Sequence, residues 1–447
     1  MSGATLLPAQ EITGNAIVDS ATVARAAWRR ANVAMQTGNL PVARAEVDRA
    51  ARAWPTQEAY LWGRASLAAR AGDTLALGSA LTAYADLGLG RDLAKEPSMA
   101  AFARLPRLQA ISERHSANYV PLANSRVVAT LPDSTFWPEG VDHDPASGAY
   151  YVGSIRHRTI AEWLPGPNRA NTPRTRELIP RGTQGIGAIL GVRVDAARGV
   201  VWATTSGIPQ MEGFTPADTL IAALLEIRIT DGTILRRFDL PPAPDGHVLG
   251  DLAVGPHGDV FVTDSRDPVL YRLAPGADTL AAMRHLLFRS LQGIAPTPDG
   301  RALYVADWSH GILRVDIATG DVIRVADALH SVSLGCDGIA WDRGAIVAVQ
   351  NGVVPARVMR FTLGADGRRF TAAAVLDRNA SIADEPTIGT IVGDAFVYVA
   401  NSQWEKYDDA GALRTGASLK KPLLLSVPLR SGPAVKRQST APPAVRP

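Results

Sequence analysis

The sequence is poor in the features that define several protein classes. It has one cysteine in 447 residues, Cys336, which excludes an intrachain disulfide. It contains no apolar run of the roughly 20 residues that a membrane-spanning helix needs. The 46 basic residues barely outnumber the 43 acidic ones, and the arginines are spread along the chain, so nucleic acid is not an expected partner. The single cysteine and scattered histidines also disfavour a structural zinc site.

Two features of the sequence leave alternatives open. Cys336 is either a small buried apolar residue or a nucleophile, and the absence of a sequence-adjacent histidine favours the first. The first residues, MSGATLLPAQEITG, lack the basic start and the apolar core of a signal peptide. The compartment therefore stays undecided between the cytoplasm and, if a leader has been removed, the periplasm.

One hairpin-forming unit recurs along the chain. Its first copy, TFWPEGVDHDPASGAYYVGS at 135–154, joins an acidic residue, a short strand, a Pro/Gly turn, a second strand and a polar exit. Five further copies follow at intervals of about 40 to 60 residues, beginning at Leu190, Asp251, Gln292, Asp337 and Glu385. Short strands that recur at this period are typical of propeller blades. We predict a mainly β fold, with a six-bladed β-propeller over 125–430.

The residues before the propeller have a helical pattern. Over 20–118, alanine is abundant and apolar residues recur at spacings of three and four. Trp28 and Trp62, like Gly38 and Gly72, are 34 residues apart, an interval that resembles tetratricopeptide repeats. Two repeats would leave an apolar face uncovered, so we expect this small α-helical domain to pack on the propeller or on a protein partner. A plain helical cap and a peptide-binding groove both fit the pattern.

The two ends of the predicted propeller both resemble strands. The sixth blade has only two obvious strands before Trp404, and further strand-like segments lie at 125–131 and 422–428. We predict that 125–131 is the outer strand of the sixth blade, which would close the ring and cover an exposed edge. The remaining segments are expected to be irregular: a long connection at 165–188, a polar insertion at 405–421, the N-terminus at 1–19 and a disordered tail at 431–447.

Polar residues recur at the two positions of each unit that should meet at the propeller axis. The innermost strand of a blade starts at the face to which the second strand returns, so residues before the first strand and after the second converge. The first set is Glu139, Asp251, Gln292, Asp337 and Glu385, with apolar Leu190 as the exception. The second set is Ser154, Thr205, Asp264, Asp307, Asn351 and Asn401. Nearby loops add Arg156, His157, Arg266, Trp308, His310, Gln403 and Trp404.

Carboxylates and amides that point at one axis would repel one another unless a positive charge lies between them. Calcium accepts six to eight oxygens from such side chains and water. We therefore predict a divalent cation, Ca²⁺ for preference, on Glu139, Asp251, Gln292 and Asp337. The alternative is that residues of both sets cap strand ends and turns through local hydrogen bonds, which is the favoured interpretation for Asp264, Asp307 and Asn401.

The blade motifs resemble one superfamily. Pro138-Glu139-Gly140-Val141, Gly250-Asp251-Leu252, Gln292-Gly293-Ile294 and Asp337-Gly338-Ile339 resemble the SMP-30/gluconolactonase/paraoxonase propellers, in particular a bacterial branch with short helical repeats before the propeller. The resemblance covers about 125–430 and implies hydrolysis of a lactone or ester with one catalytic calcium or similar ion. By this resemblance, Glu139 corresponds to the family's metal-binding glutamate. Asp337 corresponds to the aspartate that binds the metal and acts as base.

The chain also departs from that family pattern. Asp251 and Gln292 lie where the family usually has asparagines, and Leu190 and Leu249 lie where a catalytic histidine and an arginine are expected. The extra charge of Asp251 and the longer side chain of Gln292 alter the predicted site. These departures leave three states of the site open: an unchanged metal site, an altered one, or one that has lost catalysis.

Two functions from different classes follow. The first is a metal-dependent hydrolase with Asp337 as base and His157 and His310 as speculative helpers, although lone loop histidines are more often solvated. Its substrate-binding residues would be Arg156, Trp308, Asn351, Asn401 and Trp404. The second is a non-catalytic protein that binds a small ligand at the propeller mouth and a protein partner through its helices. A metal-free, strictosidine-synthase-like site with a pocket acid ranks last, because the axial oxygens are so many.

Overall fold

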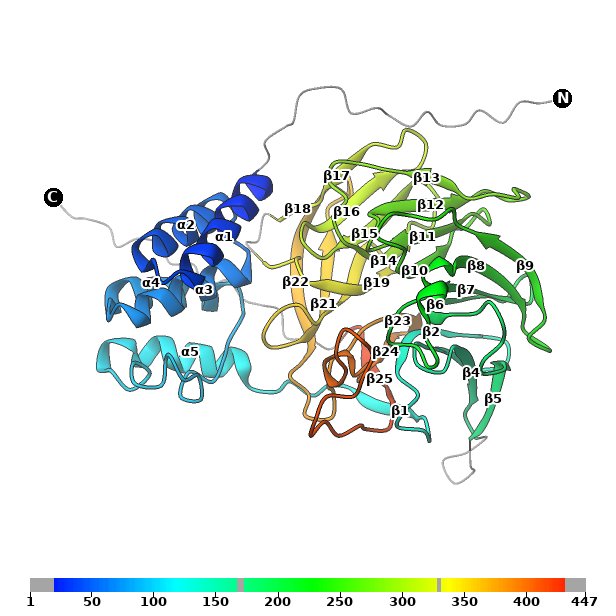
Figure 1. Cartoon of the computed structure of the whole chain (residues 1–447), viewed down its shortest axis with the longest axis horizontal. Coiled ribbons are helices and arrows are strands. Elements are labelled where there is room, and N and C mark those ends of the chain that lie inside the picture. Colours follow the sequence, from blue (N-terminus) through cyan, green and yellow to red (C-terminus); the bar gives the residue numbers. More distant parts are fainter. Residues whose placement is uncertain (1–19, 167–172, 328–330, 431–447) are drawn as a thin grey trace.

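The computed structural model describes residues 20–166, 173–327 and 331–430. A helical domain forms one end of the molecule and a ring of sheets forms the other (Figure 1). The described residues form six antiparallel-based sheets, each of four or five strands, arranged as the blades of a β-propeller. The predicted fold class, a mainly β six-bladed propeller after a small helical domain, is therefore confirmed.

The helical domain consists of two helix pairs and a further helix. The pairs are α1 (Ser20–Gln36) with α2 (Leu40–Ala53) and α3 (Glu58–Arg70) with α4 (Thr74–Asp86), and α5 (Gln109–Tyr119) follows a short 3₁₀ turn, η1 (Pro106–Leu108). Gly38 and Gly72 end the first helix of each pair with φ of 74° and 66°, a conformation that glycine adopts without steric cost. The side chains of Asn39 and Asp73 then cap α2 and α4. The likeness to tetratricopeptide repeats remains a prediction.

Blades one to three follow one another along the chain. Blade one contains β2 (Pro138–His143), β3 (Tyr150–Ser154), β4 (Thr159–Leu164) and β5 (Arg174–Ile179). Blade two contains β6 (Ala188–Asp195), β7 (Val200–Ser206), β8 (Ala222–Arg228) and β9 (Ile234–Asp239), with η2 (Pro216–Leu220) before β8. Blade three contains β10 (Leu249–Val254), β11 (Val260–Asp264), β12 (Val269–Leu273) and β13 (Ala281–Met283).

Blades four to six complete the ring. Blade four contains β14 (Leu291–Pro296), β15 (Ala302–Asp307), β16 (Gly311–Asp316) and β17 (Val322–Arg324). Blade five contains β19 (Cys336–Asp342), β20 (Ala345–Gln350), β21 (Arg357–Leu363) and β22 (Arg369–Arg378), with β18 (Ala326–Asp327) parallel to β22. Blade six contains β23 (Gly389–Val392), β24 (Ala395–Val399), β25 (Leu423–Pro428) and, from the start of the propeller, β1 (Arg126–Thr130).

Strand β1 joins the two ends of the propeller. It pairs antiparallel with β25, with Arg126 opposite Ser426 and Thr130 opposite Leu423. The outermost strand of the sixth sheet thus comes from the start of the propeller, and it pairs the edge of β25 that would otherwise be exposed.

A separate apolar core lies between each pair of neighbouring blades. Alternate residues of a strand point to opposite faces of its sheet, so each blade contributes to two cores. In β20, Ile346 and Ala348 pack toward blade four, whereas Val347 and Val349 pack toward blade six. The six cores hold the inner strands in fixed positions around the axis.

The helical domain packs against the outside of the ring next to blade five (Figure 1). Trp54, Tyr84 and Leu89 share one buried core with Leu334 and Val353, which lie in two loops of blade five. The uncovered apolar face that the sequence predicted is therefore covered, at least in part, by the propeller of the same chain.

One expected loop contains a strand. The segment 165–188 was predicted to be a long connection, but β5 occupies Arg174–Ile179 within it and pairs with β4 as the outer strand of blade one. That prediction is wrong because arginines and threonine of an exposed outer strand resemble a polar loop in sequence. The predicted irregular end at 1–19 and disordered tail at 431–447 lie outside the described residues. No helix among the described residues has both the length and the apolar character needed to cross a bilayer.

Candidate functional site

A β-bulge lies near the start of the inner strand in each of blades one to five. The pairing with the second strand shifts register between Pro138 and Val141, and at the matching place in the next four blades. Bulges turn a side chain out of the regular pleat and are frequent beside active sites. The pairs that lie within the five bulges are Glu139-Gly140, Leu190-Gly191, Gly250-Asp251, Gln292-Gly293 and Asp337-Gly338.

The four predicted metal ligands all lie within these bulges: Glu139, Gln292 and Asp337 occupy the first bulge position, whereas Asp251 occupies the second, where the other blades have glycine. The sequence placed Glu139, Asp251, Gln292 and Asp337 just before the inner strands, whereas the structure places them inside those strands, at the bulges. We call these four residues the bulge row. Leu190, the apolar exception expected from the sequence, occupies the first bulge position of blade two.

Close backbone contacts bring the inner strands together. A methyl group added at Gly140 lies 2.1 Å from the carbonyl oxygen of Leu190, and one added at Gly293 lies 2.5 Å from the carbonyl oxygen of Asp337. In blade six, Thr387 closes the ring by donating from Oγ1 to the carbonyl oxygen of Glu139 at 3.3 Å. Glycine at 140, 293 and 338, directly after Glu139, Gln292 and Asp337, is what allows neighbouring strands to approach this closely.

The acidic members of the bulge row affect one another electrostatically. Burial raises the pKa of Asp337 to about 6, the amide of Asn351 lowers it, and the charge of Asp251 raises it again. Burial also raises the pKa of Glu139 well above its ordinary value, and the charge of Asp337 adds to that rise. Burial raises the pKa of Glu385, in the loop before β23, to about 7, with a further contribution from Asp337. The axis thus concentrates negative charge that the described protein groups do not fully compensate.

Asp251 has a partner that sequence reasoning missed. Arg193, from β6 of the neighbouring blade, donates from Nη2 to Oδ2 of Asp251 at 3.0 Å. Asp251 is fully buried and Arg193 is 12% exposed, so this is a buried ion pair at the axis. Burial raises the pKa of Asp251 to about 6 although Arg193 opposes the rise. Arg193 interrupts the apolar pattern of an inner strand, which is the signal that could have revealed it.

Glu139 and Asp337 accept hydrogen bonds from residues that follow second strands. Ser402 Oγ and Trp404 Nε1 donate to Oε2 of Glu139 at 2.6 and 2.9 Å. Asn351 Nδ2 donates to Oδ2 of Asp337 at 2.8 Å, and the buried Oδ1 of Asn351 has no hydrogen-bond partner among the described residues. Trp404 and Asn351, predicted to bind substrate, therefore do lie beside the bulge row. Ser402 was missed, because a lone serine after a strand has no distinguishing signal.

The other polar residues that follow the second strands are occupied by backbone groups. Asp307 accepts four backbone N–H groups, from Arg289, Ser290, Ser309 and His310. Asp264 accepts backbone N–H groups from Val248, Arg266 and Asp267, and its Oδ2 lies 2.5 Å from Nδ1 of His247. Asn401 exchanges hydrogen bonds with the backbone of Lys421 and Leu423. We call Asp264, Asp307 and Asn401 the exit row, and local capping accounts for all three, although Asn401 was also predicted to bind substrate.

The two histidines that were predicted as catalytic helpers lie apart from the bulge row. His310 is buried against the helical domain, where Trp54 stacks on its ring at 5.7 Å and Arg25 donates to its Nε2. Its Nδ1 donates to the carbonyl oxygen of Leu287 at 2.7 Å. His157 is buried beside Thr135, whose hydroxyl lies 3.1 Å from its Nε2, and burial lowers its pKa. No interaction among the described residues joins either histidine to Asp337.

Arg156 and Trp308 differ in their surroundings. Arg156 donates from Nη1 to the carbonyl oxygens of Gln210 and Gly411, which ties blade two to the polar insertion. Trp308 is 37% exposed and its ring edge lies against Gly352, next to Asn351. Of the two, Trp308 is the one placed to contact a ligand at the mouth.

An apolar cluster lies above part of the mouth. Trp137, Leu190, Met211 and Tyr407 pack together there, with Trp404 at the edge of the cluster. The polar insertion at 405–421 therefore contributes an apolar cover through Tyr407 and Leu419. The cluster draws mainly on blades one, two and six, and Val248, just before β10 of blade three, packs against it.

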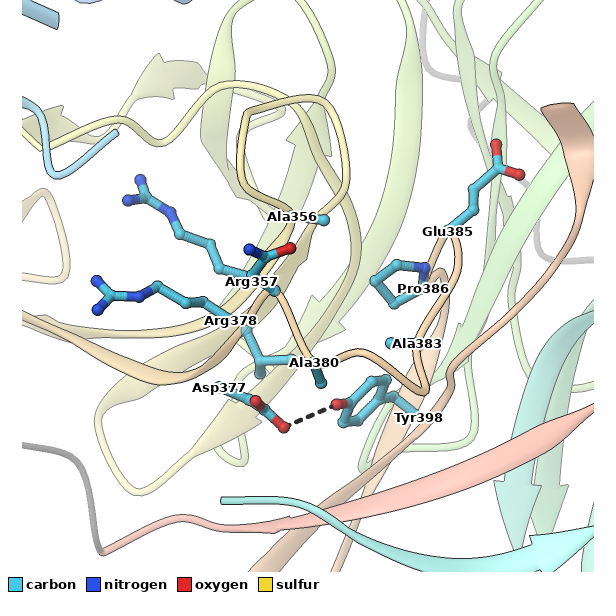
Figure 2. Close-up of a pocket in the computed structure, with 11 residues that line it drawn as sticks. Ala356, Arg357, Asp377, Arg378, Ala380, Ala383, Glu385, Pro386 and Tyr398 are labelled. Atoms are coloured by element: carbon cyan, nitrogen blue, oxygen red, sulfur yellow. Dashed lines mark hydrogen bonds between the residues drawn. The ribbon is translucent and has the colours of Figure 1, made fainter. Parts of the chain in front are cut away.

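A hollow between blades five and six lies apart from this row. It has a volume of about 70 Å³ and is lined by Asp377, Ala380, Pro386 and Tyr398, among others. Figure 2 shows Glu385 at its rim, directed away from the Asp377–Tyr398 hydrogen bond. The chemistry of the axis, rather than this hollow, defines the candidate site, because the perturbed carboxylates gather at the axis.

The bulge row fits a hard divalent cation in chemical type. Three carboxylates and the Arg193 guanidinium give a formal charge of −2, from three negative groups and one positive group. The buried, unpartnered Oδ1 of Asn351 adds a neutral oxygen beside Asp337. Among the described residues, no three His, Cys, Asp or Glu side chains lie together as a group that could hold a metal ion. A site here would therefore combine carboxylates with the amide oxygens of Gln292 and Asn351.

Comparisons with known proteins find likeness in fold. No protein-family model matches the chain, and no curated protein matches it. The luciferin-regenerating enzyme is 12% identical, with a TM-score of 0.47 over 70% of this chain and 97% of that one. Virginiamycin B lyase from Staphylococcus aureus is 14% identical, with a TM-score of 0.42 over 68% of this chain and 99% of that one. Likeness at this level carries no argument about activity.

Proposed function

We propose that the chain hydrolyses a lactone or ester at the axial mouth of its propeller, as a member of the SMP-30/gluconolactonase/paraoxonase superfamily. The observation that carries the proposal is the bulge row: buried carboxylates that raise one another's pKa at the point where five inner strands meet. Uncompensated charge of this kind is typical of a site that is completed by a ligand.

Glu139, Gln292 and Asp337 would hold a divalent cation, Ca²⁺ for preference, together with Asn351. When bound, the ion would polarise the substrate carbonyl and stabilise the oxyanion. Asp251 would contribute less to the ion than the sequence suggested, because Arg193 already neutralises it.

Asp337 is the base in this proposal. Its deprotonated carboxylate takes a proton from water, the resulting oxygen attacks the carbonyl carbon, and the C–O bond of the lactone or ester then breaks. The proton passes to the leaving alkoxide, so the products are an acid and an alcohol. Asn351 orients Asp337 through its hydrogen bond of 2.8 Å. Trp308, which is exposed beside Asn351, would contact the substrate.

The test is a panel of lactones and esters assayed with the full chain, after EDTA treatment and after Ca²⁺ is restored. We expect turnover that EDTA removes and Ca²⁺ restores. Asp337→Asn should lower kcat by about 10²- to 10⁴-fold, the range for loss of a general base. Asp245→Asn, at an exposed position, is the matched control. Turnover indifferent to both EDTA and Asp337→Asn would reject the proposal.

A second candidate is a binding protein without catalysis. The buried Arg193–Asp251 pair favours it, because part of the row is already neutralised by the protein itself. In that case the mouth would hold a small ligand, and the exposed side of the helices would hold a protein partner. Saturable ligand binding that Glu139→Gln abolishes, with no turnover on any member of the panel, would favour this candidate.

A further inference from the structure

A buried hydrogen-bonded relay runs from the helical domain to the loops that carry Asp337 and Asn351. Arg357, at the start of β21, donates from Nη1 to the carbonyl oxygen of Gly88, just beyond α4, at 3.1 Å. Its Nε donates to Oε1 of Gln350 at 2.8 Å. Gln350 Nε2 in turn donates to the carbonyl oxygens of Val332 and Leu334, each at 2.8 Å. We call Arg357 and Gln350 the relay.

The relay ends at the two loops that position the site. Leu334 lies three residues before Asp337, and Gln350 directly precedes Asn351, whose amide donates to Asp337. A backbone hydrogen bond from Gly352 to Gly335, at 3.1 Å, joins the two loops a second time. A shift of either loop would therefore move Asn351 relative to Asp337.

The helical domain supports the same loops by packing. Val332, Leu334 and Val353 are buried in a core that is otherwise made of helical-domain residues such as Trp54 and Tyr84. The backbone N–H of Gly90 donates to the carbonyl oxygen of Val354 at 3.2 Å. Without this cover the apolar residues of both loops would face water, and the loops would lose their anchors.

The relay contains a buried positive charge, unpaired within the described part of the chain, which lowers the stability of the fold. Arg357 is 3% exposed, has no ion pair among the described residues, and its Nη2 has no hydrogen-bond partner there. Burial lowers the pKa of Arg357 to about 10. A buried cation without a carboxylate is destabilising compared with an apolar side chain of similar size, so its presence here points to a role other than stability.

We propose that Arg357 and Gln350 are positioning residues that fix Asn351 against Asp337, so that the helical domain forms the outer support of the axial site. The consequences for catalysis rest on the proposed function, whereas the effect on the hydrogen bond between Asn351 and Asp337 does not. In this view the helices complete the site within one chain.

The test compares Arg357→Met with Arg378→Met in the full chain. Arg378 pairs across the sheet with Arg357 and also reaches the helical domain, by donating to the carbonyl oxygens of Val120 and Ala117, but it does not contact Gln350. Gln350→Met breaks the relay without removing a charge, so it separates loss of positioning from loss of the guanidinium. Circular dichroism and melting temperature report whether each variant folds.

The main readout is hydrogen exchange of the Asn351 side-chain amide by nitrogen-15 NMR of labelled asparagine, assigned with Asn351→Gln. The hydrogen bond to Asp337 protects that amide, so loosening it in Arg357→Met and Gln350→Met should speed the exchange about threefold to tenfold. The Kd for Ca²⁺ should rise about threefold to tenfold, and kcat should fall with KM unchanged. Arg378→Met should match wild type in all three.

Two outcomes would contradict the proposed positioning role of the relay. One is unchanged exchange of the Asn351 side-chain amide in both Arg357→Met and Gln350→Met. The other is the same change in Arg378→Met as in Arg357→Met, which would indicate general loosening of the domain contact. If the wild-type chain neither binds Ca²⁺ nor turns over any substrate, the proposed function fails, but the exchange of the Asn351 amide still tests the relay.

Discussion

The bulge row and the exit row contain the same kinds of side chain but differ in how those side chains are satisfied. In the exit row, Asp307 accepts four backbone N–H groups and Asp264 accepts three. In the bulge row, Asp337 accepts one hydrogen bond from a side chain, and its pKa rises to about 6. The first pattern is that of a structural cap, whereas the second leaves a buried carboxylate with little compensation from the described residues.

The difference has a simple geometric origin. An aspartate at the end of a second strand faces the turn that follows, where successive N–H groups point toward it. A residue at an inner-strand bulge instead faces the axis, where the neighbouring groups are equivalent residues of other blades. The repeated blade therefore gives the exit row local N–H donors that compensate its charge. In the bulge row, the charges of carboxylates from different blades add up at the axis instead. The predictions that follow test this contrast, from the largest expected effect to the smallest.

Asp307→Ala should lower the free energy of unfolding by about 4 kcal/mol. The change leaves four N–H groups without their acceptor, and each buried, unsatisfied group costs roughly 1–3 kcal/mol. Urea unfolding measures the loss, and Asp231→Ala, in an exposed turn, is the control. A loss below about 1 kcal/mol would show that the exit row is not a set of structural caps.

Arg193→Met should destabilise the metal-free chain by about 3 kcal/mol at pH 8, because it leaves the buried Asp251 without its ion-pair partner. Ca²⁺ should recover part of this loss, since Asp251 then becomes free to face the cation. Thermal unfolding with and without Ca²⁺ gives both values. Equal stabilisation of wild type and variant by Ca²⁺ would exclude Asp251 from any cation site.

Asp337→Asn should stabilise the protein, in contrast to the two substitutions above. It should raise the free energy of unfolding of the metal-free chain by about 2 kcal/mol at pH 8. The pKa of Asp337 is about 6 in the folded protein and 3.8 ordinarily. Its ionisation therefore opposes folding once the pH exceeds 3.8, and the full loss of stability is reached above pH 6. The advantage of the variant should vanish near pH 4, where the carboxyl is protonated in wild type. Destabilisation at pH 8, as expected for Asp264→Asn, would erase the distinction between the two rows.

His247→Gln should have the smallest effect. The hydrogen bond to Asp264 raises the pKa of His247 in the folded protein, so its charged form stabilises the fold below the ordinary pKa near 6.5, and this is lost as pH rises through the folded value. We expect a loss of about 1 kcal/mol at pH 5.5 and little at pH 9. His143→Gln is the control. A loss that does not depend on pH would assign His247 a packing role only.

The fold was predictable from local repetition. Acid, strand, turn and strand recur six times, and each copy is short enough for its pattern to be recognised in sequence. The outer strand β5 escaped prediction because its exposed residues, Arg174–Glu177, follow no apolar alternation. Periodicity identifies strands only where at least one face is buried.

The site was predictable in part for the same reason. Glu139, Gln292 and Asp337 share one place in the repeat and Asp251 lies at the next, so the sequence could group the four without coordinates. Contacts between distant segments follow no repeat: Arg193 reaches Asp251 across 58 positions, and Arg25 meets His310 across 285. Such pairs depend on blade order and domain packing, which a single sequence does not contain.

Calcium titration of the EDTA-treated chain by isothermal calorimetry tests the central claim most directly. The account predicts one ion per chain, affinity reduced at least tenfold by either Glu139→Gln or Asp337→Asn, and no change in Asp245→Asn. Absence of binding, or binding that survives both row substitutions unchanged, would contradict it.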